Sequence, residues 1–281
     1  MTLKTKVLLE GLAFGESPRW HGGKLWFSDM HAHQVMTVDL KGKTEVIAEV
    51  PGQPSGLGWL PDGRLLVVSM TDKRLLRLDH DGLTEVADLS KLASGYCNDM
   101  VVDKHGRAYI GHFGYDLYVK TPSPALADVI LVTPDGNSRV VANNMNFPNG
   151  TVITPDGRTL IVAESFGSLL TAFDIETNGS LTGRRVWAKL DSVPDGICLD
   201  AEGCTWVAVM PGREVIRISE GGEVKQRIQF TDQPFACMLG GPDRRTLFIL
   251  TATTTDPDEA RAKASGRIET VRVKIPGAGL P

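Results

Sequence analysis

The feature that most constrains the fold of this chain is an internal repeat. A short polar turn followed by an apolar run occurs six times, beginning at residues 21, 61, 103, 155, 200 and 242. Neighbouring copies start 40, 42, 52, 45 and 42 residues apart, so the repeat fills most of the 281 residues. The turns are of the type Pro61-Asp62-Gly63-Arg64, and the runs that follow have the length and aliphatic composition of β-strands. A period of this length is typical of repeat architectures such as propellers.

Each copy contains enough residues for four strands. The apolar run is followed by a second pair of segments that mix polar and apolar residues, as in Arg74-Leu75-Leu76-Arg77-Leu78-Asp79. Helical periodicity is absent except for a turn or two near residues 88–93 and 124–128. Four-stranded units repeated every ~40–50 residues are the pattern of β-propeller blades. We therefore predict an all-β, six-bladed β-propeller that forms one domain over residues 1–281. A two-sheet sandwich, the rival fold, would not need six matched copies.

The ring formed by these copies must also close. The last copy supplies only three strands, near residues 237–241, 246–251 and 267–274. An unpaired edge strand on an otherwise closed ring would expose backbone hydrogen-bonding groups and favour aggregation. We therefore expect the N-terminal segment Lys6–Leu12 to pair as the outer strand of the last blade.

One position of the repeat carries unusual polar residues. Counting back five or six residues from each turn reaches the start of the innermost strand, which borders the central channel. Two carboxylates and two carboxamides occur at this position, and hard oxygen donors that converge on one axis suit a divalent cation of the Ca²⁺ or Mg²⁺ type. The alternative without function is that Asn149-Gly150 and Asp195-Gly196 are turn dipeptides. The occurrence of four carboxylate or carboxamide residues at one repeat position favours the metal site. The six residues at this position are Glu16, Ser55, Asn98, Asn149, Asp195 and Cys237.

The links between second and third strands should lie on the same face as these donors. Two of them, 112–128 and 251–266, are much longer than a hairpin needs, and long loops on a rigid scaffold often contact ligands. We expect 112–128 to contact a ligand through Phe113, Tyr115 and Tyr118, and we interpret the charge-rich 251–266 as a flexible insertion. His31 and His33 in another link are either an exposed loop pair or a proton-transfer pair.

Composition and missing motifs exclude several functional classes. Thirty Lys and Arg against 34 Asp and Glu give a net charge of −4 without like-charge runs, so we expect no nucleic-acid or anionic-membrane partner. No apolar run approaches the ~20 residues that span a bilayer, and we expect a cytoplasmic protein. The four cysteines form no C-x-x-C pair and are expected to be buried free thiols. Nucleophile-elbow, phosphate-loop, zinc-protease and EF-hand motifs are absent.

Several motifs, taken in order, resemble the regucalcin/gluconolactonase/luciferin-regenerating-enzyme family. The resemblance implies a six-bladed propeller with one divalent cation and, in many members, lactonase activity on sugar-acid lactones. It also implies that Glu16, Asn149 and Asp195 are metal ligands, with Asn98 beside the metal or on the substrate. Ca²⁺ is the first choice of cation, with Mg²⁺, Mn²⁺ or Zn²⁺ as alternatives. The motifs are Glu16-Ser17-Pro18-Arg19-Trp20, Asn98-Asp99, Phe147-Pro148-Asn149-Gly150, Pro194-Asp195-Gly196 and the stretch that begins Cys237-Met238-Leu239.

The resemblance implies a metal-dependent hydrolase that opens a lactone or a related small ester at the channel mouth. The cation would polarise the carbonyl, and Asp195 would take the proton of the attacking water, with Asp99 and Glu164 as fallback bases. The family's sugar lactonases carry Arg where this chain has Tyr96, and Gly where it has Met100. Together with Phe113 and Tyr115, these departures predict a more apolar pocket and a substrate less hydroxylated than gluconolactone. The predicted substrate-binding residues are Asn98, Tyr96, Asp99, Phe113, Tyr115 and Glu164.

Two other functions remain open at this stage. One is a non-catalytic propeller that binds a small ligand and in which the cation is only structural, as a plug of the channel. The other is phosphotriester hydrolysis, because the same cation would polarise a P=O group. In each case we expect a monomer or a weak homo-oligomer with a small-molecule partner.

Overall fold

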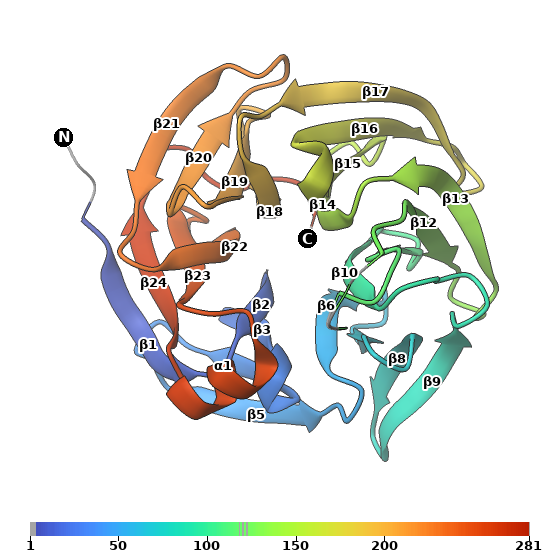
Figure 1. Cartoon of the computed structure of the whole chain (residues 1–281), viewed down its shortest axis with the longest axis horizontal. Coiled ribbons are helices and arrows are strands. Elements are labelled where there is room, and N and C mark those ends of the chain that lie inside the picture. Colours follow the sequence, from blue (N-terminus) through green and yellow to red (C-terminus); the bar gives the residue numbers. More distant parts are fainter. Residues whose placement is uncertain (1–3, 118, 120, 122, 281) are drawn as a thin grey trace.

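The protein is a closed ring of β-sheets. The computed structural model describes residues 4–117, 119, 121 and 123–280. Six four-stranded antiparallel sheets surround a central channel as blades, and the colours of Figure 1 follow the chain around the ring once. The predicted six-bladed all-β propeller is thereby confirmed. No helix in the described part of the chain is long and apolar enough to cross a membrane.

Blades 1 to 5 each use four consecutive strands, ordered from the channel outward. Within a blade the strands pair antiparallel, so the first and third strands point one way and the second and fourth the other. Blade 1 holds β2 (Gly15–His21), β3 (Lys24–Asp29), β4 (Gln34–Val38) and β5 (Thr44–Glu49); blade 2 holds β6 (Pro54–Trp59), β7 (Leu65–Ser69), β8 (Arg74–Asp79) and β9 (Gly82–Asp88); blade 3 holds β10 (Cys97–Val102), β11 (Ala108–His112), β12 (Ala127–Val132) and β13 (Ser138–Met145).

The last blade joins the two ends of the chain. Strand β1 (Lys6–Leu12) pairs with β24, with Lys6 opposite Thr270 and Leu12 opposite Gly266, so the predicted N-terminal closure is confirmed. Blade 4 holds β14 (Pro148–Ile153), β15 (Thr159–Glu164), β16 (Leu169–Ile175) and β17 (Leu181–Lys189); blade 5 holds β18 (Val193–Leu199), β19 (Thr205–Met210), β20 (Glu214–Ile218) and β21 (Val224–Gln229); blade 6 holds β22 (Gln233–Gly240), β23 (Thr246–Ala252), β24 (Gly266–Arg272) and β1.

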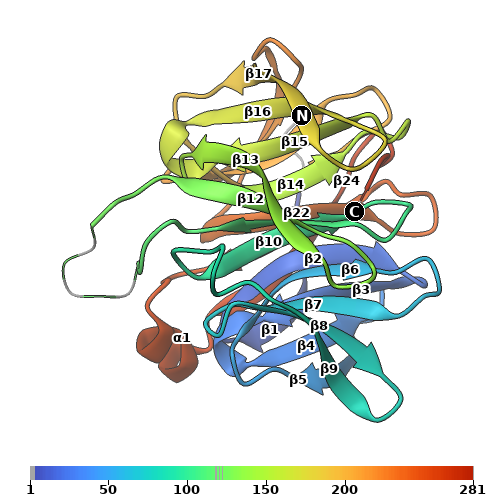
Figure 2. The same ribbon diagram turned by 90° about the vertical axis from the view of Figure 1, so that its right-hand side faces the viewer.

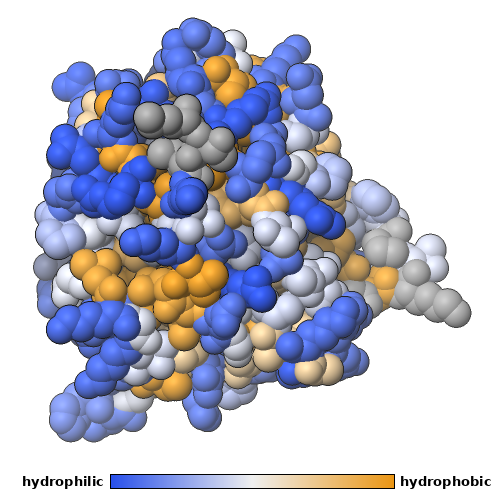
Figure 3. All heavy atoms as spheres, turned by 90° about the vertical axis from the view of Figure 1, so that its left-hand side faces the viewer, coloured by the Kyte–Doolittle hydropathy of each residue, from blue (hydrophilic) through white to orange (hydrophobic). Residues whose placement is uncertain are grey.

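The core lies between neighbouring blades. The inner strands are buried on both faces, as in β10, whereas the outer strands alternate between buried and exposed residues, as in β21. Figure 3 shows the outer edge on the left of Figure 1, which is mostly hydrophilic with hydrophobic side chains in several places, the largest group lying near the middle of the view. All four cysteines are free and buried, as predicted.

The inner strands pack backbone against backbone near the channel. A Cβ atom added to Gly150 would lie 2.6 Å from the Ile197 amide nitrogen, and one added to Gly196 would lie 2.6 Å from the Ala236 Cα. Both glycines are inside strands β14 and β18, so the alternative that Asn149-Gly150 and Asp195-Gly196 form turns is wrong. These glycines are needed because the neighbouring blade leaves no room for a side chain.

Each inner strand shifts its pairing register close to its start. In β14, for example, Pro148 pairs with Glu164 but Thr151 pairs with Val162, which leaves one unmatched residue on the inner strand. Such a bulge bends the strand and re-aims a side chain, here toward the channel mouth. The same shift occurs in the other inner strands β2, β6, β10, β18 and β22.

The shift in β22 identifies the sixth rim residue as Phe235. Phe235 lies between Pro234 and Ala236, where the register changes, whereas Cys237 pairs regularly with Ile249. The Cys237 side chain is 2% exposed and belongs to the core between blades. The expectation that Cys237 borders the channel is therefore wrong by two residues.

Two long links project from one face of the ring, as Figure 2 shows. They are the described residues of 113–126, between β11 and β12, and residues 253–265, between β23 and β24. The second link contains α1 (Pro257–Lys263), so its interpretation as a flexible insertion is wrong. Asp256 caps this helix by accepting hydrogen bonds from the N–H groups of Asp258 and Glu259, and Pro257 stands in the first turn. Neither 88–93 nor 124–128 is helical.

The opposite end of the channel is crossed by the C-terminal segment. Leu280 exchanges backbone hydrogen bonds with Ile153 of blade 4, and the N–H of Ala278 donates to the carbonyl of Leu199 in blade 5. The N–H of Gly277 donates to the carbonyl of Arg244 in blade 6. The segment thus ties three blades together at the end where their hairpin turns lie, and the C-terminus appears in the middle of the ring in Figure 1.

Candidate functional site

The polar residues at the start of four inner strands line one cavity. Glu16 of blade 1, Asn98 of blade 3, Asn149 of blade 4 and Asp195 of blade 5 all border a cavity of about 540 Å³ at the channel mouth. Ser55 of blade 2 does not line it but lies behind it, with its hydroxyl 3.5 Å from the Asn98 side-chain oxygen. The structure therefore brings together the four oxygen-bearing residues that the repeat predicts.

Hydrogen bonds from the protein orient the two carboxamides. The Asn149 side-chain nitrogen donates to the Ser165 hydroxyl at 3.1 Å and also to the Asp195 carboxylate. Ser165, in the single-turn 3₁₀ helix η2 (Ser165–Gly167), donates in turn to the Pro194 carbonyl at 2.7 Å. The Asn98 side-chain nitrogen donates to the Pro148 carbonyl at 3.2 Å. With both nitrogens engaged, each amide keeps its oxygen as an acceptor.

The carboxylates of the cavity lack a positive partner from the protein. Burial is the main cause that raises the pKa of Glu16 well above its usual value, and the charge of Asp195 adds to it. Burial likewise raises the pKa of Asp195 to about 7, against the hydrogen bond from Asn149, which lowers it. Asp99, the third carboxylate nearby, is ion-paired with Arg19 at 2.5 Å. Half-buried Glu16 and buried Asp195 remain without an ion-pair partner among the described residues, and their two negative charges match the charge of one divalent cation.

The donor set also fits such a cation chemically. The described residues hold no group of three or more His, Cys, Asp or Glu side chains placed for a metal ion. A site here would instead use two carboxylate and two carboxamide side chains and water. Ca²⁺ accepts this mixture of charged and neutral oxygens, whereas Zn²⁺ prefers nitrogen and sulfur ligands.

The walls of the cavity are largely aromatic. On one side the rings of Phe113 and Phe147 stack with centroids 4.5 Å apart, and Phe166 is tilted against Phe147 at 4.8 Å. On the other side Phe14 contacts Phe235 at 4.7 Å. All five rings line the cavity. Of these, sequence reasoning predicted only Phe113. Phe14 and Phe147 stand two residues before a rim residue, Phe235 is the rim residue of blade 6, and Phe166 is in a link, and the repeat pattern has no fixed residue type at these places.

His31 is a functional candidate that the sequence left ambiguous. It belongs to η1 (Met30–Ala32), is 1% exposed and lines the cavity, with the Gln53 amide 3.5 Å from its Nδ1. Burial lowers its pKa to about 4, so the ring is neutral near pH 7. His33 does not line the cavity; its Nδ1 lies 2.9 Å from the Pro51 carbonyl. Thr255 and Asp256, at the start of the link that contains α1, also line the cavity.

Four predicted substrate-binding residues lie behind the cavity wall. Tyr96 and Tyr115 pack against the aromatic cluster, and the Tyr96 hydroxyl is 3.5 Å from the Asp116 carboxylate. Asp99 is held by Arg19, and Glu164 accepts hydrogen bonds from the side chains of Thr171 and Arg184 and from the Asn146 N–H. None of the four lines the cavity. Tyr118 lies outside the described residues.

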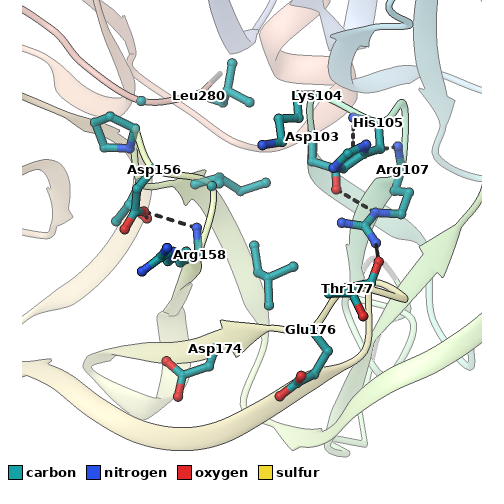
Figure 4. A pocket seen from close by; sticks show the side chains of 16 residues that line it. Asp103, Lys104, His105, Arg107, Asp156, Arg158, Asp174, Glu176, Thr177 and Leu280 are labelled. Carbon is teal, nitrogen blue, oxygen red and sulfur yellow. Dashed lines mark hydrogen bonds and ion pairs between the residues drawn. The ribbon is translucent and has the colours of Figure 1, made fainter.

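A larger groove lies at the other end of the strands. It has a volume of about 1,060 Å³ and is formed by the hairpin turns of blades 3 and 4 and by the C-terminal segment (Figure 4). Its charged groups are engaged in these turns: Asp103 pairs with Arg107, and Asp156 accepts from the Arg158 N–H. The hydrogen bonds within its own turn lower the pKa of Asp156. This groove has the volume of a ligand site, but its carboxylates Asp103 and Asp156 are engaged in their own turns, unlike the buried unpaired carboxylates that are typical of catalytic sites.

Comparison with known proteins agrees with this architecture. The SMP-30/Gluconolactonase/LRE-like region matches residues 14–253. Regucalcin from Xenopus laevis is 27% identical over 285 residues, covering 98% of this chain and 94% of that protein. A 6-deoxy-6-sulfogluconolactonase from Pseudomonas putida is 25% identical over 291 residues, covering 100% and 98%. The solved structure of a calcium-binding protein, regucalcin, from Agrobacterium tumefaciens has a TM-score of 0.83 at 23% identity, covering 100% and 97%.

Proposed function

The chain belongs to the SMP-30/Gluconolactonase/LRE-like family, and we propose that it is a metal-dependent hydrolase that opens a small lactone or related ester. The observation that carries this proposal is a pair of carboxylates with raised pKa values, half-buried Glu16 and buried Asp195, in a cavity of about 540 Å³. That volume suits a small ring with one substituent. The lactonase name of the Pseudomonas putida relative supports the reaction class.

We assign the metal site to Glu16, Asn149 and Asp195, with Asn98 beside it. The calcium-binding description of the Agrobacterium relative supports Ca²⁺ as the first choice. A divalent cation bound there would supply Lewis-acid polarisation of the lactone carbonyl. The residues themselves contribute fixed geometry, because each sits at the bulge of a buried inner strand.

Asp195 is the residue that we assign to take the proton from the attacking water. The Asn149 amide fixes its carboxylate by a hydrogen bond, and the surrounding aromatic walls limit access of bulk water. The two fallback bases are engaged elsewhere: Asp99 with Arg19, and Glu164 with Arg184. Of the three candidate bases, Asp195 is therefore the one that lines the cavity.

The direct test is the near-isosteric substitution Asp195→Asn, assayed on a panel of lactones with Ca²⁺ present. We expect a folded protein whose kcat falls by about 10²–10⁴-fold. The matched control is Glu164→Gln, which removes a buried carboxylate of blade 4 that does not line the cavity, and which should retain turnover within about tenfold after correction for folded protein. Full activity of folded Asp195→Asn would refute the assignment.

The non-catalytic alternative makes a different prediction. If the cation were only a structural plug, wild-type protein would hydrolyse no lactone, and chelation would lower the melting temperature without changing any turnover. Phosphotriester hydrolysis would appear as activity on an aryl phosphotriester in the absence of lactonase activity. A cytoplasmic location and a monomeric or weakly oligomeric state stay predictions.

A further inference from the structure

The aromatic wall on the side of blades 3 and 4 suggests what the substrate carries besides its reactive ring. Resting on the proposed function, we propose that the cavity selects lactones with a hydrocarbon substituent. The side chains of Phe113, Phe147 and Phe166 form the subsite that holds this substituent. The substrate class is then an alkyl- or aryl-substituted lactone rather than a polyhydroxylated or anionic one.

The three rings form a continuous ladder from the interior to solvent. Phe113 and Phe147 are stacked at 4.5 Å with an interplanar angle of 12°, and both are nearly buried. Phe166 continues the ladder at 4.8 Å from Phe147 and is 49% exposed. An apolar substituent that projects from a lactone on the cavity floor would cover this exposed ring. Covering apolar surface is favourable in proportion to the area removed from water.

The backbone at Phe147 has a conformation that the repeat shares, since Gln53 at the equivalent position of blade 2 has a φ angle of 65°. The φ angle of Phe147 is 63°, in the left-handed region that residues other than glycine, Asn and Asp rarely adopt. Residues in this conformation persist where the surrounding structure holds them. The conformation places a phenyl ring between Phe113 and Phe166, where a glycine would relieve the strain but leave a gap in the ladder.

The amide and hydroxyl donors of the two carboxamides and Ser165 are already used within the protein, so they offer little to a sugar. The Asn149 amide donates to Ser165 and Asp195, Ser165 donates to a carbonyl, and Asn98 donates to a carbonyl. Asp256 accepts the N-terminal amides of α1. A sugar hydroxyl buried here would compete with bonds already made within the protein, and a buried polar group without a partner costs about tenfold in affinity or more.

The described side chains of the cavity walls also supply no positive charge to an anionic substituent. Among the described residues that line it there is no Lys or Arg, and His31 is neutral near pH 7. An isolated anionic group taken out of water needs a counter-charge. A sulfonate-bearing lactone, of the kind in the name of the Pseudomonas putida relative, would find none on these walls.

The test compares three lactones that share a six-membered ring: glucono-δ-lactone, δ-valerolactone and the pentyl-substituted δ-decalactone. We expect kcat/KM to be at least tenfold higher for δ-decalactone than for δ-valerolactone, and lowest for glucono-δ-lactone. Phe166→Ala should lower the ratio of δ-decalactone to δ-valerolactone by about tenfold, which corresponds to about 1.4 kcal/mol. The control Val186→Ala, a 52% exposed apolar residue on outer strand β17 of the same blade, should leave the ratio unchanged.

The outcomes separate this inference from the proposed function. Turnover that is fastest on glucono-δ-lactone, or a ratio unaffected by Phe166→Ala, overturns the inference and leaves the lactonase proposal intact. If no lactone is hydrolysed, the lactonase proposal fails, and calorimetry with the unreactive pentyl-substituted lactam tests the subsite alone. Binding that weakens about tenfold in Phe166→Ala upholds the subsite, and equal binding in both proteins overturns it.

Discussion

The ion pair below the cavity offers a sharp test of the electrostatic reasoning. Arg19 has only 3% of its side chain exposed, and Asp99 has 9%. The guanidinium donates to the Leu57 carbonyl of blade 2 at 3.0 Å, and to the Asp99 carboxylate and the Met100 carbonyl of blade 3. One side chain of blade 1 therefore links three blades and neutralises a carboxylate next to Asn98.

We predict that Arg19→Met strongly destabilises the protein. The substitution keeps an apolar stem but leaves Asp99 buried without a counter-charge, which costs about 3–5 kcal/mol. An unfolding entropy of about 2.1 cal/mol/K per residue over the 281 residues amounts to about 0.6 kcal/mol/K. A loss of about 4 kcal/mol then lowers the melting temperature by about 7 °C. Urea and thermal unfolding in EDTA measure both quantities.

The matched variants are Asp99→Asn and the double substitution Arg19→Met/Asp99→Asn. Replacing Asp99 by neutral Asn should recover part of the stability lost in Arg19→Met, because the double variant has no buried charge without a partner at this place. Ca²⁺ should raise the melting temperature more in Arg19→Met than in wild type, because unpaired Asp99 adds negative charge near Glu16 and Asp195. A double variant as unstable as Arg19→Met, or a loss below about 1 kcal/mol, would refute this reasoning.

Three further predictions concern close packing, pH and the cation. Gly150→Ala should lower the free energy of unfolding by about 2–3 kcal/mol, because its Cβ would lie 2.6 Å from the backbone of blade 5. The control Gly212→Ala, whose Cβ would have no atom nearer than 3.4 Å, should lower it much less. Equal losses of stability in urea unfolding would contradict this reasoning. Burial lowers the pKa of His112 from 6.5 to about 4, so its contribution to stability is complete above pH 6.5 and is lost as the pH falls through 4. The backbone nitrogens of Gly114 and Asp128 each lie 3.0 Å from a ring nitrogen of His112, and a protonated ring can accept a hydrogen bond from neither. His112→Asn should therefore flatten the pH dependence of the melting temperature between pH 6.5 and 4. An unchanged slope would disprove this role of His112. EDTA should lower the melting temperature and Ca²⁺ at 100 times its Kd should restore about 2.7 kcal/mol, and a melting temperature insensitive to both would remove the basis for a cation.

The sequence by itself determined the architecture. Six copies of a turn and an apolar run specify six blades, because hairpin chemistry and strand alternation are local properties that any copy displays. The count of strands in the last copy also predicted that Lys6–Leu12 closes the ring, as β1 does. The repeat even located Glu16, Asn98, Asn149 and Asp195 at one level of the channel, since equivalent positions of equivalent units must meet at the axis.

Only the tertiary structure decided which side chains line the cavity. Tyr96 lies two residues before a rim residue and Glu164 ends strand β15, yet both pack behind the wall. Phe147, Phe166 and His31 line the cavity instead. The physical reason is that a one-residue bulge in each inner strand and the packing of neighbouring blades set side-chain direction, and neither follows from the repeat pattern. The bulge in β22 also places Phe235, and not Cys237, at the sixth rim position. Helix α1 at the mouth begins at a local cap, Asp256, which the charge-rich composition of the link did not suggest.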